Sequence, residues 1–400
     1  MRKLRAFARP SAFAVLIAIG AGSLALAPRP GSTRYTSYGD VALDLPTRLS
    51  DSAFWQMVTD FSEPNGYFRS DNLVSNELTF QHVIPALVAE HGTGGIYLGV
   101  GPDQNFTYVV ALKPRLAFIV DIRRGNLQQH LLYKALIEMS STRADFLSLL
   151  FSRPRPPAAA GQTRIDSLIA AYDSVPADSV LYRRTLASVR RKLVDEHRFP
   201  LTQGDLDGLD YVFRAFFESG PQLTYSFGTG NRGFYGGWRG MPTYSELMVQ
   251  TDADGVARGY LANEENFRVL RELEEKNLLV PIVGDFAGDK ALRAVGGYLK
   301  SHGATVSAVY TSNVEQYLFQ SDDAWRRYYA NVATLPLDRR STFVRAVFNY
   351  GGWRDPGAGR GPRSVTMLAP IAEMVEAVQD GRIQSYWDVI QFSRSPVEMR

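Results

Sequence analysis

Residues suited to ligand binding and proton transfer stand at the ends of four apolar segments. They are Gly99 with Gly101, Asp121, Asp285 and Tyr310. A glycine lets the backbone approach a ligand closely, and a carboxylate can accept hydrogen bonds from ribose hydroxyls. Aspartate and tyrosine can also hold or move a proton. Because ligands of open α/β sheets bind beyond the carboxyl ends of the strands, we expect these residues to meet at one edge of a sheet.

The first two of these segments belong to one continuous unit, GGIYLGVGPDQNFTYVVALKPRLAFIVDIRR, over residues 95–123. It predicts an apolar strand, a glycine turn, a helix from about Asp103 to Leu112, and a second strand over Leu116–Val120. The second strand is apolar throughout, as expected of a parallel strand buried on both faces. A helix N-terminus beside glycines, with an acid at the tip of the next strand, suits a nucleotide-type ligand.

A polar segment precedes the first strand and allows two interpretations. Its polar residues are Arg69, Ser70, Asp71, Asn72, Ser75, Asn76 and Glu77. One interpretation is a solvated turn followed by a helix that Ser75 or Asn76 caps and Pro85 kinks. The other is a lip that folds over the ligand, because the segment leads directly to the glycine-turn strand. In that case Asn72 contacts the ligand and Glu77 is a candidate general base.

Strands and helices alternate again after residue 277. The apolar run 278–283 predicts a strand that ends at Asp285, and a helix over 290–302 leads to a strand over 305–310. Ser312 and Glu315 fit a capping box for the next helix. Further strands are expected near 343–349 and 364–367, and helices near 322–333 and 370–379. The sequence therefore predicts the α/β class, with a doubly wound, mostly parallel sheet.

Residues 140–277 interrupt this alternation and predict a mostly helical insertion. Helices are expected over about 164–172, 181–197 and 264–276, the last capped by Asn263. The stretch 223–240 holds six glycines interleaved with aromatic residues. It is either a lid over the ligand or a loop whose aromatic residues dock on the core. We expect Rossmann-like halves over 50–139 and 278–400 on either side of the insertion.

Composition excludes several classes of function. Apolar residues make up 45% of the chain and charged residues 21%, which is typical of a globular protein. The net charge of +3, with basic and acidic residues mixed, does not favour nucleic acid. The absence of cysteine excludes thiolate catalysis, and none of the five histidines form an H-x-x-x-H pair, so we expect no metal. A small-molecule ligand is the remaining partner.

Residues 1–30 have the pattern of a secretory signal peptide. Four basic residues precede an uncharged run over 10–28, and Ala25-Leu26-Ala27 offers a cleavage site. Left uncleaved, the run would serve as a single membrane anchor. We therefore expect an exported protein that contacts the membrane only through this segment. A cytoplasmic protein is expected only if the leader reflects a misplaced start codon.

Four stretches of the chain resemble an uncharacterised bacterial family with a class I S-adenosylmethionine-dependent methyltransferase-like, Rossmann-like fold. They are GYFRSDNLVSNE (66–77), YLGVGPDQNF (97–106), VPIVGDFAG (280–288) and SNVEQYLF (312–319). The resemblance implies S-adenosylmethionine as the cofactor. By that resemblance Gly99 and Gly101 form the cofactor turn, Asp121 binds the ribose, and Asp285 lies near the methyl group or the substrate. We further expect Asp103, Asn105 and Asn72 to contribute to cofactor binding. We expect Asp285, Tyr310 and Glu77 to be the catalytic residues.

The sequence departs from methyltransferases at several positions. Asp103 replaces the third glycine of the turn, Tyr97 stands where an acid is common, and no N/D-P-P-Y motif follows Asp285's strand. A dinucleotide fingerprint fails as well, because Gln104 replaces its third glycine. Three hypotheses follow: a methyltransferase, a non-catalytic ligand-binding protein of the same fold, and another enzyme such as a hydrolase using Asp285. No G-x-S-x-G elbow supports a serine hydrolase.

Overall fold

The computed structural model describes residues 44–161, 164–227, 241–348 and 364–394. The predicted leader, residues 1–30, lies outside the described residues. So do residues 228–240 of the glycine- and aromatic-rich loop, and the choice between a lid and a docked loop stays open.

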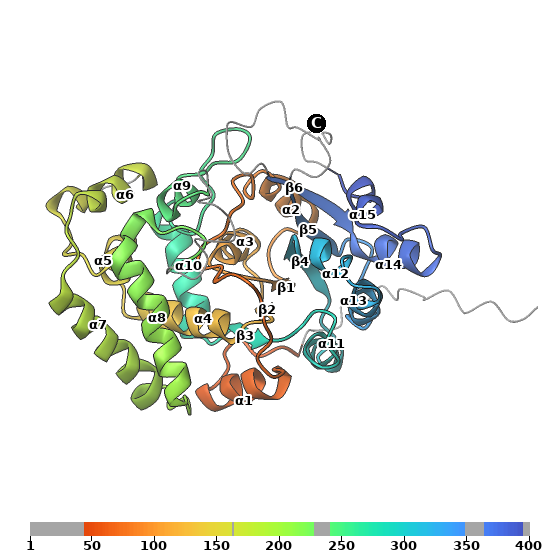
Figure 1. Ribbon diagram of the computed structural model, residues 1–400, viewed down its shortest axis with the longest axis horizontal. Coiled ribbons are helices and arrows are strands. Elements are labelled where there is room, and N and C mark those ends of the chain that lie inside the picture. Colours follow the sequence, from red (N-terminus) through yellow and green to blue (C-terminus); the bar gives the residue numbers. More distant parts are fainter. Residues whose placement is uncertain (1–43, 162–163, 228–240, 349–363, 395–400) are drawn as a thin grey trace, which may run out of the picture. The chain divides into compact units, whose positions relative to one another are not determined.

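Six strands form one sheet in the order β3-β2-β1-β4-β5-β6 (Figure 1). They are β1 Ile96–Gly99, β2 Leu116–Asp121, β3 Leu279–Val283, β4 Val306–Ser312, β5 Thr342–Phe348 and β6 Ser364–Pro370. The first five are parallel, and β6 pairs antiparallel with β5 at the edge. This arrangement confirms the α/β class and the mostly parallel sheet. The strand order reverses between β1 and β4, so the chain leaves the centre of the sheet in both directions.

Helices cover both faces of the sheet (Figure 1). On one face lie α2 Ile84–His91, α3 Gln104–Leu112, α4 Arg124–Glu138 and α10 Glu264–Glu275. On the other lie α11 Ala291–Ser301, α12 Val314–Leu318, α13 Ala324–Val332 and α14 Ile371–Gln379, with α1 Asp51–Phe61 beside α11. The last helix, α15 Tyr386–Phe392, packs through Ile390 on β5 and β6. Every residue of β1, β2 and β3 is buried, which explains their continuous apolar sequences.

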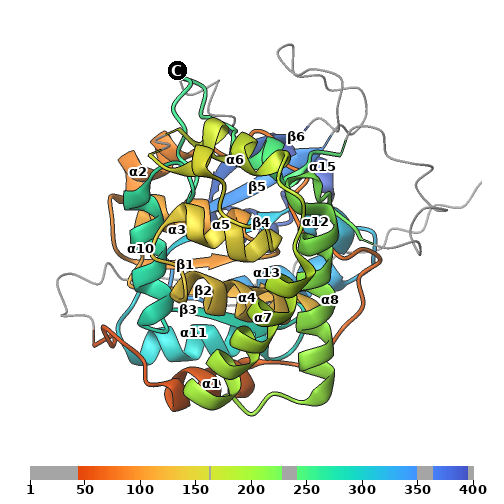
Figure 2. The ribbon, with the colours of Figure 1, turned by 90° about the vertical axis from the view of Figure 1, so that its left-hand side faces the viewer.

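The chain between β2 and β3 forms a second helical layer outside α4 (Figure 2). Its helices are α5 Arg143–Phe151, α6 Ile165–Asp173, α7 Ser179–Arg190, α8 Gln203–Ser219 and α9 Tyr244–Met248. Short turns of other helix types join them: η1 Pro157–Ala159, η2 Arg191–Glu196 and η3 Gly220–Gln222. Covered by the sheet on one side and this layer on the other, α4 is buried without a break from Asn126 to Ile137. The domain boundaries given above stay a prediction.

The predicted start of the helix after the lip segment is wrong. Neither Ser75 nor Asn76 caps a helix, because residues 78–83 form bends and turns and α2 begins only at Ile84. Pro85 lies in the first turn of α2, where its missing N–H costs no hydrogen bond, so it starts the helix instead of kinking it. The helix α4 begins at Arg124, whose amide donates to the side chain of Asn65 at 2.7 Å. Among the described residues, no helix combines the length and apolar character needed to cross a bilayer.

His197 joins three helical segments through two carboxylates. Its Nδ1 lies 2.8 Å from Asp51 of α1, and its Nε2 lies 2.8 Å from Glu138 of α4. Only the doubly protonated ring can donate to both acids. Burial alone would lower the pKa of His197, but the hydrogen bonds to Glu138 and Asp51 outweigh it, and the pKa is raised. Lys134, which also pairs with Glu138, opposes this effect by its charge.

We predict that the stability contributed by His197 decreases as the pH rises. A histidine whose pKa is raised by folding stabilises the protein fully below its ordinary pKa of 6.5, and this contribution is lost as the pH rises through the folded value. The urea midpoint of the wild type should therefore exceed that of H197Q most clearly at pH 6 and least at pH 9. Burial raises the pKa of Glu274 to about 8. This group titrates in both proteins, so its contribution cancels when the two pH profiles are compared. Parallel pH profiles for the two proteins would contradict this role.

Candidate functional site

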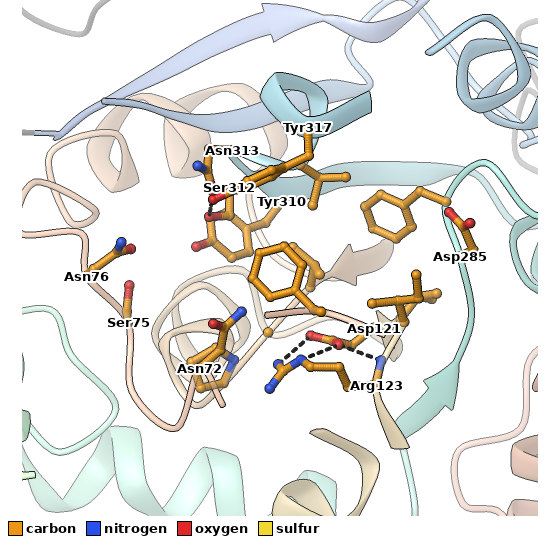
Figure 3. Close-up of a pocket in the computed structure, with 18 of the residues that line it drawn as sticks. Asn72, Ser75, Asn76, Asp121, Arg123, Asp285, Tyr310, Ser312, Asn313 and Tyr317 are labelled. Carbon is orange, nitrogen blue, oxygen red and sulfur yellow. Dashed lines mark hydrogen bonds and ion pairs between the residues drawn. The ribbon is translucent and has the colours of Figure 1, made fainter. Parts of the chain in front are cut away.

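A cavity of about 150 Å³ lies at the carboxyl ends of β1, β2, β3 and β4 (Figure 3). Gly101 lines it after β1, Asp121 ends β2, Asp285 follows β3, and Tyr310 stands near the end of β4. The prediction that these strand ends meet at one edge of the sheet is confirmed. The order of the strands reverses between β1 and β4, which is where α/β sheets usually bind ligands.

Residues 62–77, which we call the lip, run across these strand ends. The backbone N–H of Glu63 donates to Val283 at the end of β3, and that of Gly66 donates to Ile122 after β2. Further along, the side chain of Glu77 reaches β4. Figure 3 shows Asn72, Ser75 and Asn76 on the lip side of the cavity. The segment therefore lies across the strand ends, in the place that the lip interpretation requires.

Glu63 fixes the loop that carries Asp285. Its carboxylate accepts hydrogen bonds from the backbone N–H groups of Asp285 at 2.9 Å, Lys290 at 2.8 Å and Ala291 at 2.9 Å. The last two of these groups lie at the start of α11, where a negative charge also suits the helix dipole. A side chain at Gly288 would collide with the carboxylate, since an added Cβ would lie 2.4 Å from Glu63. Sequence reasoning missed Glu63 because its partners lie more than 200 positions away.

Glu77 is a buried carboxyl group, only 1% exposed, that lines the cavity. It accepts hydrogen bonds from Gln104 at 2.8 Å, Tyr310 at 2.8 Å and Ser312 at 2.5 Å. All three donors are neutral, and no cation pairs with Glu77 among the described residues. Burial raises the pKa of Glu77, although the three hydrogen bonds oppose that effect. A carboxyl group with a raised pKa beside a cavity is suited to proton transfer near neutral pH.

Two residues of the cavity wall have left-handed backbones. The φ angle is +49° at Asn72 and +50° at Ser312. Ser312 also follows an irregularity in the pairing of β4 with β5, between Tyr310 and Ser312. Such conformations are uncommon outside glycine and concentrate at functional sites, where the surrounding structure maintains them. Here they set the positions of an amide on the lip and a hydroxyl that contacts Glu77.

The glycine turn after β1 is held from within the protein. The Asn105 side chain donates to the carbonyls of Val100 at 2.9 Å and Pro102 at 2.7 Å, and accepts from Tyr97 at 2.8 Å. Gly99 leaves room for this side chain, because an added Cβ would lie 1.9 Å from Asn105. Gly101, with φ at +82° and open space beside it, is the glycine that lines the cavity.

Three of the predicted site residues, Gly99, Asp103 and Asn105, do not line the cavity. Asp103 is 2% exposed and accepts a hydrogen bond from Tyr260 at 2.7 Å. Burial raises the pKa of Asp103 to about 7, against the effect of that hydrogen bond. The structure therefore places Asp103 and Asn105 behind the turn, where they can shape it, and brings Gly101, Asp121, Asn72, Asp285, Tyr310 and Glu77 together around the cavity.

Asp121 forms an ion pair with Arg123 inside the cavity (Figure 3). Its Oδ1 accepts from the backbone N–H of Arg123 at 2.9 Å and from Nε at 3.1 Å, and its Oδ2 accepts from Nη2 at 2.9 Å. Another guanidinium nitrogen donates to the carbonyl of Asp71 in the lip. A carboxylate offers about four acceptor positions, so about one remains for a ligand. Arg123 directly follows the predicted strand end, but sequence reasoning gave it no role.

Glu315 does not take part in the predicted capping box. It is 1% exposed and pairs with Arg345 of β5, whose Nε lies 2.5 Å from Oε2. Ser312 donates to Glu77 instead of capping α12. The Arg345–Glu315 pair fixes α12, whose Val314, Tyr317 and Leu318 line the cavity. A local motif was overridden here because a buried arginine needed a buried acid.

Aromatic side chains complete the walls. They are Phe68, Tyr225, Phe286 and Tyr317. Phe68 and Tyr317 meet edge to face with centroids 5.1 Å apart, so the lip packs on α12. Tyr225 belongs to the aromatic stretch 223–240, which the sequence analysis singled out, whereas Phe68, Phe286 and Tyr317 were not predicted.

Residues 72–204 and 224–382 match a family that is described as a domain of unknown function, DUF7790. The two matches together span well over half of the chain. The chain belongs to the DUF7790 family. The matched segments carry the whole sheet and most of the cavity, and the break between them falls in α8. A comparison with the curated proteins found no match to the chain.

We predict that E315Q lowers the free energy of unfolding by about 3 to 5 kcal/mol, because it leaves the charge of Arg345 buried without its partner. Urea unfolding measures the change. The matched control is E272Q, whose carboxylate is 47% exposed in its pair with Arg268, and which should cost less than about 1 kcal/mol. Equal effects of the two substitutions would mean that the buried pair does not hold α12.

Proposed function

We propose that this protein binds an adenosine-type ligand at the carboxyl edge of its sheet and acts as an S-adenosylmethionine-dependent methyltransferase. The observation that carries the proposal is the cavity itself. It brings the glycine after β1, the acid that ends β2 and the acid after β3 to the point where the strand order reverses. Doubly wound folds bind nucleotide ligands at this position. The strand order and the helices on both faces support a methyltransferase-like Rossmann fold.

The residues of the cavity fit an adenosine group in most respects. Gly101 leaves open space for a ligand beside the backbone, and Asp121 keeps about one acceptor position for a ribose hydroxyl. Val120, Ile122 and Phe286 provide an apolar wall that suits a planar base. The ion pair with Arg123 limits Asp121 to one ribose contact where a free carboxylate would make two.

S-adenosylmethionine would supply an electrophilic methyl group, and the residues of the chain would align the acceptor and exclude water. Glu77 has a raised pKa and lies in the cavity wall, so it is suited to accept the proton of the acceptor. Tyr310 and Ser312 donate to Glu77 and so orient its carboxyl group. Asp285, which Glu63 holds through the loop backbone, faces the cavity from the end of β3.

The ion pair of Asp121 with Arg123 favours a second candidate function, a non-catalytic binding protein of the same fold. A ligand that carries an anionic group would use the guanidinium of Arg123, not the carboxylate of Asp121. Such a protein could act outside the cytoplasm. S-adenosylmethionine is a cytoplasmic metabolite and is not expected there. The expected export of the chain is compatible with this candidate.

We predict that S-adenosylmethionine and S-adenosylhomocysteine bind the wild type in calorimetry, and that D121N weakens both about tenfold or more by removing a charged acceptor. The control D289N removes a neighbouring exposed acid and should leave affinity unchanged. R123M should retain or improve binding, because it frees acceptor positions on Asp121. Absence of binding to the wild type would refute the adenosine proposal, and loss of binding in R123M alone would favour an anionic ligand.

A further inference from the structure

The ionisable side chains around the cavity are unbalanced in charge. Apart from tyrosines, they are Glu77, Asp121, Arg123 and Asp285. Arg123 neutralises Asp121 by a direct ion pair, whereas Glu77 and Asp285 form no ion pair with any described residue. When both acids are ionised, the cavity therefore carries excess negative charge. In a partly enclosed site this charge is screened less than it would be on the surface.

We propose that the cavity binds a ligand group of positive charge, an alkylammonium, against the carboxylate of Glu77. Glu77 is 1% exposed, and a buried carboxylate usually has a cationic partner or a metal. Its three donors are neutral, and Oε1 accepts two of the bonds while Oε2 accepts one. About one acceptor position remains on Oε2, which is where an ammonium N–H would donate.

The remaining walls of the cavity suit such a group. Phe68 and Phe286 present aromatic rings, which attract cations and pack against the carbon atoms of an alkylamine. The ring of Tyr317 already faces the guanidinium of Arg69, 5.4 Å from its centroid. The amides of Asn72 and Asn76 and the hydroxyl of Ser75 come from the lip and can accept further N–H bonds. A neutral hydroxyl ligand would leave the charge of Glu77 uncompensated.

This inference deepens the proposed function. It rests on that function only where it makes the amine the methyl acceptor. The ammonium would pass one proton to Glu77, and the freed nitrogen lone pair would form the new N–C bond. The sulfur–methyl bond would break with its electron pair left on sulfur, so the positive charge moves from sulfur to nitrogen. Binding of the amine itself does not require S-adenosylmethionine.

The test compares amines with alcohols of the same shape on the full chain without S-adenosylmethionine. Calorimetry at pH 7 uses benzylamine against benzyl alcohol, and 1,4-diaminobutane against 1,4-butanediol. We expect at least one amine to bind tenfold or more tightly than its alcohol. Equal affinity within both pairs, or no binding of either amine, would overturn the inference on the wild type alone, whatever the variants do.

Two variants locate the contact. E77Q keeps the size of the side chain and removes its charge, and it should reduce the affinity of the amine to that of the alcohol. D289N removes the charge of an exposed acid that does not line the cavity, and it should keep the preference for amines. An amine preference that survives in folded E77Q, judged by its urea midpoint, would place the cation elsewhere and refute the role of Glu77.

Failure of this inference is distinguishable from failure of the proposed function. Binding of S-adenosylmethionine without any preference for amines would refute the cation site and keep the adenosine site. A preference for amines in a protein that does not bind S-adenosylmethionine would keep the cation site and refute the methyltransferase.

Discussion

The site depends on two carboxylates of one segment, which tie the lip to the sheet. Glu63 accepts three backbone N–H bonds, one after β3 and two at the start of α11, and Glu77 accepts three side-chain bonds from α3 and β4. Glu63 thus satisfies amides that a helix start leaves without partners, and Glu77 satisfies three buried side-chain donors. Because both acids belong to the lip, the segment lies across four strand ends, and the cavity is the space left beneath it.

Sequence patterns predicted the sheet well because its strands are buried on both faces. The apolar runs that became β1, β2 and β3 need no distant information to be recognised, and the polar residues that follow them must lie at the same edge. Local rules failed where distant partners competed. Ser312 and Glu315 fit a capping box in spacing, yet Glu77 and Arg345 bind them instead, because buried charge and buried donors outweigh a helix cap.

Asp121 shows both the success and the limit of reading a site from spacing. Its position at the tip of β2 followed from the apolar strand before it, and the structure places it in the cavity wall. Its chemistry did not follow, because Arg123 two residues later turns back and takes most of its acceptor positions. The position of Asn105 was also misjudged from local sequence. Its side chain donates to the backbone of its own turn, as short polar side chains in turns often do, and does not line the cavity.

Two buried acids of this region, Glu315 and Glu77, differ in their partners. The difference distinguishes a structural role from a functional one. Glu315 has a buried arginine beside it, so the charge is balanced within the protein and stabilises the position of α12. Glu77 has only neutral donors and faces a cavity. Stability alone would favour an apolar residue at such a position, because a buried carboxylate without a cation is costly. Positions that are unfavourable for stability in this way are expected at functional sites. In the site that we propose, the ligand supplies the cationic partner that Glu77 lacks among the described residues.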